Sequence, residues 1–126
     1  MRAYTVAATA VALGVSSKWV DNVLSHHQVP GVQQTRQGVT RKVTPAALLT
    51  LDIALRLVRS LRLPLPQALE TARHLIDARE GGIPLSGTAS IQISADVETL
   101  TRDLNARLAR AVEMSPTPPR GRPRRK

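Results

Sequence analysis

Residues 6–24 read VAATAVALGVSSKWVDNVL, a pattern typical of two short helices joined by a tight turn. Ala10 is small enough for two helices to cross closely, and Gly14 permits the turn between them. Val20 continues an apolar stripe on the second helix, and Ser16 stands where an N-cap would begin it. The pattern predicts a helix-turn-helix. A plain helical hairpin inside a core is the alternative.

The composition indicates one small domain with a modest core. The 126 residues include no Phe, one Trp and one Tyr, so Leu, Val, Ile and Ala supply that core. There is no cysteine, which excludes disulfides, thiolate zinc sites and a cysteine nucleophile and fits a reducing compartment. The longest apolar run is too short to span a membrane and lacks a signal-peptide layout. We therefore expect a soluble cytoplasmic protein without a membrane partner.

The net charge of +9 is distributed unevenly. Residues 1–62 carry eight Lys or Arg against two Asp, and residues 63–114 carry five Arg against seven acidic side chains. Residues 115–126 carry five positive side chains and no acid. Such clustering is the footprint of a protein held on a phosphate backbone. The expected partner is double-stranded DNA, with the protein associated with the nucleoid.

We expect the N-terminal end of the second predicted helix, residues 17–26, to contact DNA. That end of a recognition helix enters the major groove, where Lys18 suits a phosphate or a guanine edge and Asn22 suits adenine. Trp19 has two interpretations, packing and base contact, and burial tendencies favour packing. The candidate DNA-binding residues here are Ser16, Ser17, Lys18, Trp19 and Asn22. His26 and His27 lack the cysteines or carboxylates of a metal site, so phosphate contact or plain exposure is expected of them.

Residues 32–44, VQQTRQGVTRKVT, alternate around a Gln37-Gly38 turn and predict a small β-hairpin. Its inward positions are Val32, Val39 and Val43. A basic hairpin directly after a helix-turn-helix is a wing, and a solvated hairpin with ordinary surface charge is the alternative. The DNA-contacting candidates of this wing are Arg36, Arg41 and Lys42.

Two longer helices are expected next. Thr44 and Pro45 form a cap followed by proline at the first helical position, and apolar residues then repeat at three and four to about Arg62. Pro66 opens a further helix that runs to about Arg79 and ends at Gly81-Gly82.

Residues 4 to about 76 resemble the DNA-binding domain of MerR-type regulators and of the related excisionase-like proteins. The matching positions are Ala10, Gly14, Val15, Ser16 and Val20, the wing sequence GVTRKVT at 38–44, and LLTLDIALRLVRSL at 48–61, which leads into LRLPLPQAL at 61–69. The resemblance implies a mainly α winged helix-turn-helix that binds a two-fold operator as a homodimer. Asp21-Asn22 replaces the family's Arg-Tyr pair, and Val43 replaces its wing aromatic. No effector domain or sensor cysteine follows, so metal or drug sensing is not implied.

The last third of the chain predicts a strand and a helix. Residues 90–94, SIQIS, alternate as a short strand that needs a partner, either the wing or a second chain. Ser94 would cap a helix over residues 95–114, with Asp96 and Glu98 at its positive end. Its apolar stripe comprises Val97, Leu100, Leu104, Leu108 and Ala111. We favour this stripe as a dimer seam over a cover for its own domain, because the earlier helices offer a complete core.

Residues 115–126 form a Pro- and Arg-rich segment that predicts a disordered tail. Its PRGRP sequence at 119–123 resembles an AT-hook, in which glycine lies on the floor of a narrow minor groove and arginines reach along it. A non-specific phosphate clamp is an equal alternative. The residues concerned are Arg120, Arg122, Arg124, Arg125 and Lys126.

These observations divide the chain into a DNA-binding domain at 1–79, a loop, strand and dimerisation helix at 80–114, and the tail. The expected function is a sequence-specific, dimeric transcriptional regulator without a cofactor. An architectural or excisionase-like DNA-bending protein and an adaptor that binds another protein through residues 90–114 are the alternatives. An enzyme is not expected, since the three histidines have no carboxylate pair, nucleophile motif or glycine-rich phosphate loop beside them.

Overall fold

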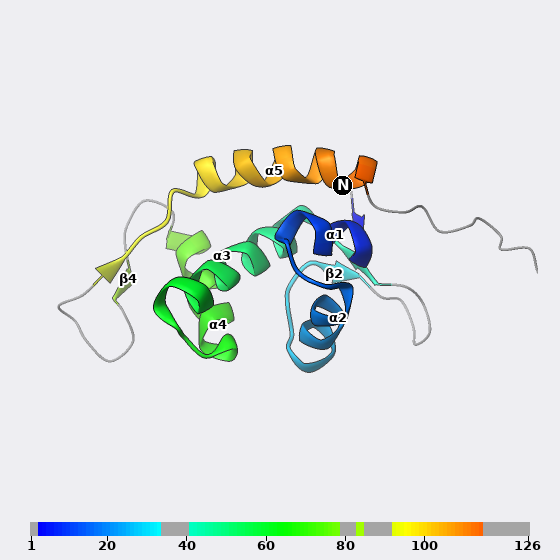
Figure 1. Ribbon diagram of the computed structural model, residues 1–126. Coiled ribbons are helices and arrows are strands. Elements are labelled where there is room, and N and C mark those ends of the chain that lie inside the picture. Colours follow the sequence, from blue (N-terminus) through cyan, green and yellow to red (C-terminus); the bar gives the residue numbers. More distant parts are fainter. Residues whose placement is uncertain (1–2, 34–40, 79–82, 85–91, 115–126) are drawn as a thin grey trace, which may run out of the picture.

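The computed structural model describes residues 3–33, 41–78, 83–84 and 92–114. Within these ranges the fold is mainly α, with two small antiparallel sheets. The elements in chain order are β1 (Tyr4–Thr5), α1 (Val6–Leu13), α2 (Ser17–His26), β2 (Val32–Gln33), β3 (Lys42–Val43), α3 (Pro45–Leu61), α4 (Leu65–Ala78), β4 (Ile83–Pro84), β5 (Gln92–Ile93) and α5 (Val97–Met114). Figure 1 shows α5 lying across α1 and α3, with α2 and α4 on the side away from α5. None of the helices in the described ranges is long and apolar enough to cross a membrane.

The predicted helices at the start of the chain are confirmed. α1 begins at the first residue of the predicted pair, α2 has the expected bounds of 17–26, and Thr5 caps α1 by accepting a hydrogen bond from the Ala8 amide at 3.1 Å. Thr44 caps α3 by accepting from the Ala47 amide at 3.4 Å, and Pro45 is the first helical residue. α3 ends one residue before the expected Arg62, and α4 starts one residue before the expected Pro66. The predicted Gly81-Gly82 stop lies outside the described residues.

The first sheet has the strand order β1-β3-β2. Val32 pairs with Val43 in antiparallel register, which confirms the predicted pairing of the hairpin strands. Tyr4 pairs with the other side of Val43, so residues 4–5 form a strand that the sequence did not indicate. Two residues are too few to show alternation, which explains the omission. The predicted turn at Gln37-Gly38 and the inward Val39 lie outside the described residues.

The core is centred on α3, whose residues 47–55 are all buried. Leu48 and Leu51 of α3 are fully enclosed, because α4 packs along one side of this helix and α1 and α5 pack on others. Apolar side chains buried this completely supply most of the stability of a small domain. The helix therefore acts as the central support against which the other helices are positioned.

The second sheet corrects two expectations about the last third of the chain. β5 pairs with β4, Ile83 opposite Ile93, so its partner is neither the wing nor a second chain. Ser94 is not the cap of the last helix. The Asp96 carboxylate accepts from the Thr99 amide at 3.0 Å, and α5 begins at Val97. An aspartate caps as well as a serine, and its position two residues later decides where the helix begins.

The apolar stripe of α5 is buried within a single chain. Val97, Leu104, Leu108 and Ala111 are each 5% exposed or less, and α5 packs mainly on α1 and also on α3. The interpretation of this stripe as a dimer seam is therefore wrong for the described residues. The physical reason is that α1 and α3 present apolar surface that the earlier helices leave uncovered, and α5 removes it from water.

Candidate nucleic-acid interface

The turn between α1 and α2 is fixed by backbone hydrogen bonds at both of its ends. Gly14 adopts φ +72°, and its amide donates to the carbonyls of Ala10 and Val11. The Val15 amide also donates to Ala10, at 3.0 Å. On the other side, the Ser16 hydroxyl accepts from the Trp19 amide at 3.0 Å. These bonds satisfy groups that helix ends otherwise leave unpaired, so the start of α2 has a defined direction.

α2 has one buried and one exposed face. Val20 and Val23 are 0% and 3% exposed and anchor the helix to the rest of the fold. The exposed polar residues of α2 are Ser17, Lys18, Asp21, Asn22, Ser25 and His26. Of the predicted site residues, the structure therefore brings Ser16, Ser17 and Lys18 together at the beginning of α2, and Asn22 follows one turn after Lys18 on the same exposed face. A helix with this polarity can lie on a polyanionic surface without losing its packing.

The predicted hairpin residues are partly described. Lys42 is exposed on β3, and Arg41 is half-buried, with its guanidinium 3.5 Å from the carboxylate of Asp21 on α2. This ion pair links the start of the β3 segment to the polar face of α2. The charge of Arg41, which was expected to face DNA, is thereby partly balanced by Asp21. Arg36 and the tail residues Arg120, Arg122, Arg124, Arg125 and Lys126 lie outside the described residues.

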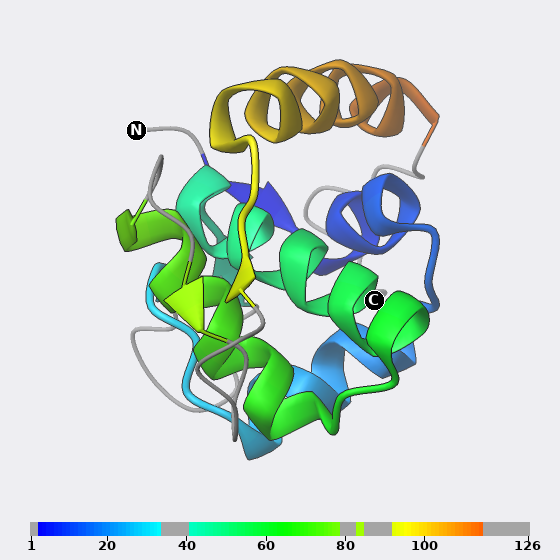
Figure 2. The ribbon, with the colours of Figure 1, turned by 90° about the vertical axis from the view of Figure 1, so that its left-hand side faces the viewer.

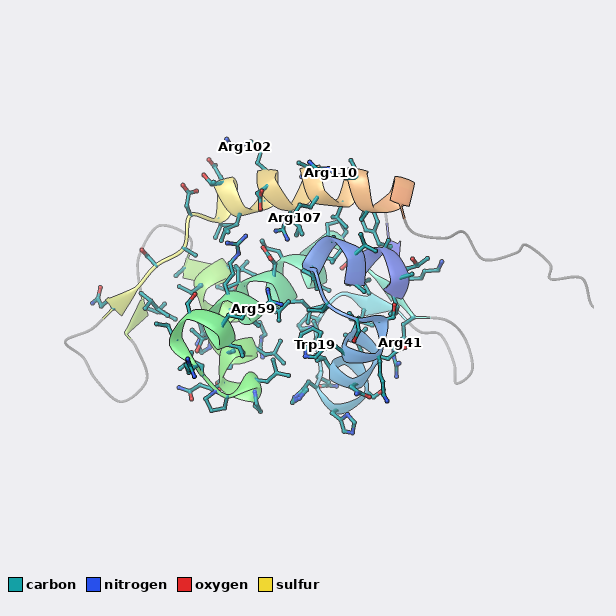
Figure 3. All side chains as sticks on the ribbon, in the orientation of Figure 1. Trp19, Arg41, Arg59, Arg102, Arg107 and Arg110 are labelled. Atoms are coloured by element: carbon teal, nitrogen blue, oxygen red, sulfur yellow. The ribbon has the colours of Figure 1, made fainter. Side chains whose placement is uncertain are left out.

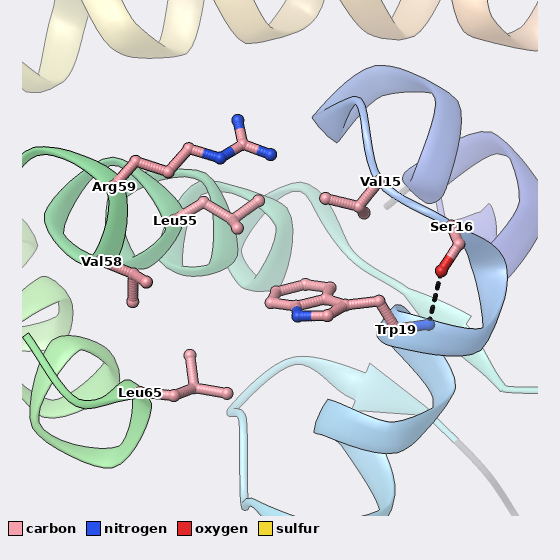
Figure 4. A pocket seen from close by; sticks show the side chains of 7 residues that line it. All are labelled: Val15, Ser16, Trp19, Leu55, Val58, Arg59 and Leu65. Atoms are coloured by element: carbon pink, nitrogen blue, oxygen red, sulfur yellow. Dashed lines mark hydrogen bonds between the residues drawn. The ribbon is translucent and has the colours of Figure 1, made fainter. Parts of the chain in front are cut away.

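Trp19 stands in an open groove between α2 and the α3–α4 corner. The groove has a volume of about 420 Å³, and Leu55, Val58 and Leu65 form its apolar wall. Figure 4 shows the indole directed toward Leu55 and Leu65, and the half-buried ring packs against the core. The geometry favours the packing interpretation of Trp19. A base contact stays a prediction.

Arg59 is a cation near this helix start that the sequence did not assign to the site. It is exposed, and it lines the same groove as Ser16 and Trp19 (Figure 4). The signal was weak, since Arg59 is one of two arginines in the second half of α3 and only its place in the groove beside Trp19 distinguishes it. Its position adds a positive charge to the groove that Ser16 and Trp19 line.

Arg107 of α5 contacts the C-terminal end of α1. One guanidinium nitrogen donates to the carbonyl oxygen of Ala12 at 2.8 Å, and the other terminal nitrogen lies 3.0 Å from the Asp52 carboxylate on α3. Its Nε donates to Asp103 at 3.1 Å. Figure 3 shows Arg107 between α5 and the helices beneath it. The Asp52 side chain is 6% exposed, so the contact joins three helices around a buried charge.

The titratable side chains of the described residues form no grouping suited to a metal ion. No three His, Asp or Glu side chains there are grouped as metal ligands would be. The pKa of Asp96 is lowered, first by the hydrogen bond from the Thr99 amide and then by that from the Thr99 hydroxyl. This shift belongs to the cap of α5, away from α2.

Comparison with known proteins gives no further indication. No protein-family profile, no curated protein sequence and no solved structure matches this chain significantly.

Proposed function

We propose that this chain is a sequence-specific DNA-binding protein that acts as a transcriptional regulator in the cytoplasm. In this proposal α1 and α2 form a helix-turn-helix, and the start of α2 lies in the major groove. The β2–β3 hairpin is the wing and contacts flanking phosphates, and the basic tail adds contacts in the minor groove.

The observation that carries the proposal is the exposed polar start of α2. Ser17, Lys18 and Asn22 lie together on a helix whose direction is fixed by the turn and whose other face is buried. These are side chains that donate to phosphates and to base edges. Lys42 and Arg59 add positive charge on the adjacent strand and groove, as binding to a phosphate backbone requires.

We further propose that the protein binds a two-fold operator as a homodimer. The apolar face of α5 is unavailable for that contact, because it covers α1 and α3. The dimer would therefore use another surface, and two exposed valines, Val11 and Val112, are candidates for it at 42% and 41% exposure. Sedimentation of the protein with and without a palindromic duplex measures its assembly state.

The second candidate function is an architectural protein that bends DNA. It uses the same positive surface and differs in having no preference for particular bases. The preference for the regulator rests on Asn22, a residue that reads adenine and adds nothing to non-specific attraction.

The test begins with selection of duplexes from a random library, followed by fluorescence anisotropy on the selected and a scrambled duplex over a salt series. A regulator should prefer the selected duplex by roughly a thousandfold or more at physiological salt. A ratio near one with a steep salt slope would favour the architectural alternative. Absence of binding to either duplex at low salt would refute both.

A further inference from the structure

A second concave site lies on the opposite part of the molecule from α2, where α3, α4, β5 and the start of α5 meet. It has a volume of about 310 Å³, at the lower end of the range of about 300 to 1,000 Å³ found for small-molecule sites. Figure 2 shows the segment from β5 rising past α3 to the start of α5. All the residues that line the site are in the described ranges.

The walls of this site are apolar. They are formed by side chains from the four elements and from the β5–α5 connection, namely Ile53, Leu57, Leu75, Ile93, Ala95 and Leu100. Such walls favour an apolar body because its transfer out of water is favourable. A volume of this size suits a single ring or a short branched chain rather than a peptide helix.

The rim supplies the polar recognition. On one side of the rim, the two carboxylate oxygens of Asp96 each accept one hydrogen bond from Thr99, at 3.0 and 2.8 Å. Arg56 is not saturated. Its guanidinium has two bonds, 3.4 Å to Asp52 and 3.5 Å to Asp103, its side chain is 49% exposed, and its other N–H groups bond to no described residue. The hydroxyl of Ser94 also lines the site, so Arg56 and Ser94 are the side chains there that can donate to a ligand.

We propose that this site binds a small molecule that has an apolar body and one carboxylate, and that Arg56 donates hydrogen bonds to this carboxylate. A planar guanidinium matches a carboxylate in two parallel hydrogen bonds, and such charge-assisted bonds are about twice as strong as neutral ones. Both present bonds of Arg56 are long, so turning toward a ligand costs it little. Binding at this site does not depend on the proposed DNA binding, and each can fail without the other.

The test uses phenylacetate and the neutral phenylacetamide as probes on the full chain. Methyl resonances of Ile53, Leu57, Leu75 and Ile93 are followed by NMR during each titration. The indole resonance of Trp19 serves as an internal control, because it reports the other groove. We expect shifts confined to the four methyl-bearing residues and about tenfold tighter binding of the acid than of the amide.

Two variants separate pocket from rim. Ala95→Leu fills the site and should weaken both probes tenfold or more, whereas Ala109→Leu, on the exposed side of α5, should change neither. Arg56→Gln should lower the acid-to-amide ratio to about one. Since Arg56 also contacts Asp52, the spectrum of that variant is first checked for a folded core.

Four results would overturn the proposal. They are no localised shifts at the highest soluble probe concentration, shifts centred on Trp19, equal binding of acid and amide to the unmodified chain, and unchanged binding to Ala95→Leu. Equal binding of acid and amide would show that the site does not recognise a carboxylate. Each of the other three results would show that no ligand binds at this site.

Discussion

The guanidinium of Arg107 donates to the carbonyl oxygen of Ala12 at 2.8 Å, next to the last residue of α1. The last carbonyls of a helix have no partner within the helix, so a side chain from elsewhere must reach them or water must. Because the same guanidinium contacts Asp52 on α3, one residue of α5 fixes the end of α1 relative to the central helix. The turn into α2 begins at that end.

Replacing Arg107 with methionine should lower the free energy of unfolding by about 2–4 kcal/mol. The buried Asp52 carboxylate would retain only Arg56, at 3.4 Å, and the Ala12 carbonyl would lose its donor. Urea unfolding followed by circular dichroism measures the change. Arg110→Met on the exposed side of α5 is the matched control and should stay within about 0.5 kcal/mol. Equal losses for both variants would contradict a specific role for Arg107.

Two buried threonines form a natural comparison. Thr9 on α1 is 0% exposed, and its hydroxyl has no hydrogen-bond partner among the described residues. Thr50 on α3 is 6% exposed, and its hydroxyl donates to the Ala46 carbonyl at 3.2 Å. Thr9→Val should therefore raise the free energy of unfolding by about 1 kcal/mol, because a buried hydroxyl without a partner is removed.

Thr50→Val should give no such gain, since it loses a hydrogen bond together with the hydroxyl. Chemical unfolding of the two variants against the unmodified chain gives the difference directly. A Thr9→Val protein that is less stable than the unmodified chain would show that the hydroxyl is satisfied in solution.

Gly31 is required for two reasons at once. Its φ is +94°, and a Cβ at this position would collide with the Thr44 hydroxyl that caps α3. Gly31→Ala should lower the free energy of unfolding by about 2 kcal/mol or more, the sum of a backbone penalty and a disturbed cap. Gly14→Ala, where φ is +72° but the space around a Cβ is open, should cost only about 1 kcal/mol. If urea unfolding gave equal losses, the collision with Thr44 would be ruled out.

The helices were predictable because their determinants are local. Thr5, Ser16 and Thr44 each cap a helix, and each hydroxyl accepts a hydrogen bond from the amide three residues later. The spacing of apolar residues indicates the remainder of each helix. The pairing of β1 and of β4 was not predictable, since two-residue strands have no period and their partners are distant in the chain. The stripe on α5 indicated a buried face correctly, but a periodic pattern does not say what covers it.

In the candidate interface, too, some residues could be predicted from local sequence patterns and others could not. The exposed face of α2 follows from helical periodicity, so Lys18 and Asn22 could be chosen from the sequence. The ion pair of Arg41 with Asp21 and the placement of Arg59 beside Trp19 depend on how a strand and two helices meet. Such relations are tertiary and leave no pattern in a single sequence.

If α2 reads bases, Asn22→Ala should reduce the preference for a selected duplex by about 1–3 kcal/mol and change binding to a scrambled duplex little. Lys18→Ala should show the same loss if it contacts guanine, and equal losses on both duplexes if it contacts phosphate. Matched controls on the far side of the molecule are Asn105→Ala and Arg110→Ala of α5. Anisotropy titrations that show the same ratio for Asn22→Ala and Asn105→Ala would exclude base reading by Asn22.

Asp96 should make part of the stability depend on pH. Thr99 donates from its amide and its hydroxyl to this carboxylate, which lowers the pKa of Asp96 in the folded chain. A lowered folded pKa means that the stabilisation is present above the unfolded value of about 3.9 and is lost as pH falls through the lower folded value. The thermal midpoint of Asp96→Ala should therefore lie below that of the unmodified chain at neutral pH, and the gap should narrow in strong acid. Asp77→Ala, an exposed aspartate on α4, is the control. A gap for Asp96→Ala that stays constant from neutral pH to strong acid would show that the cap acts without its charge.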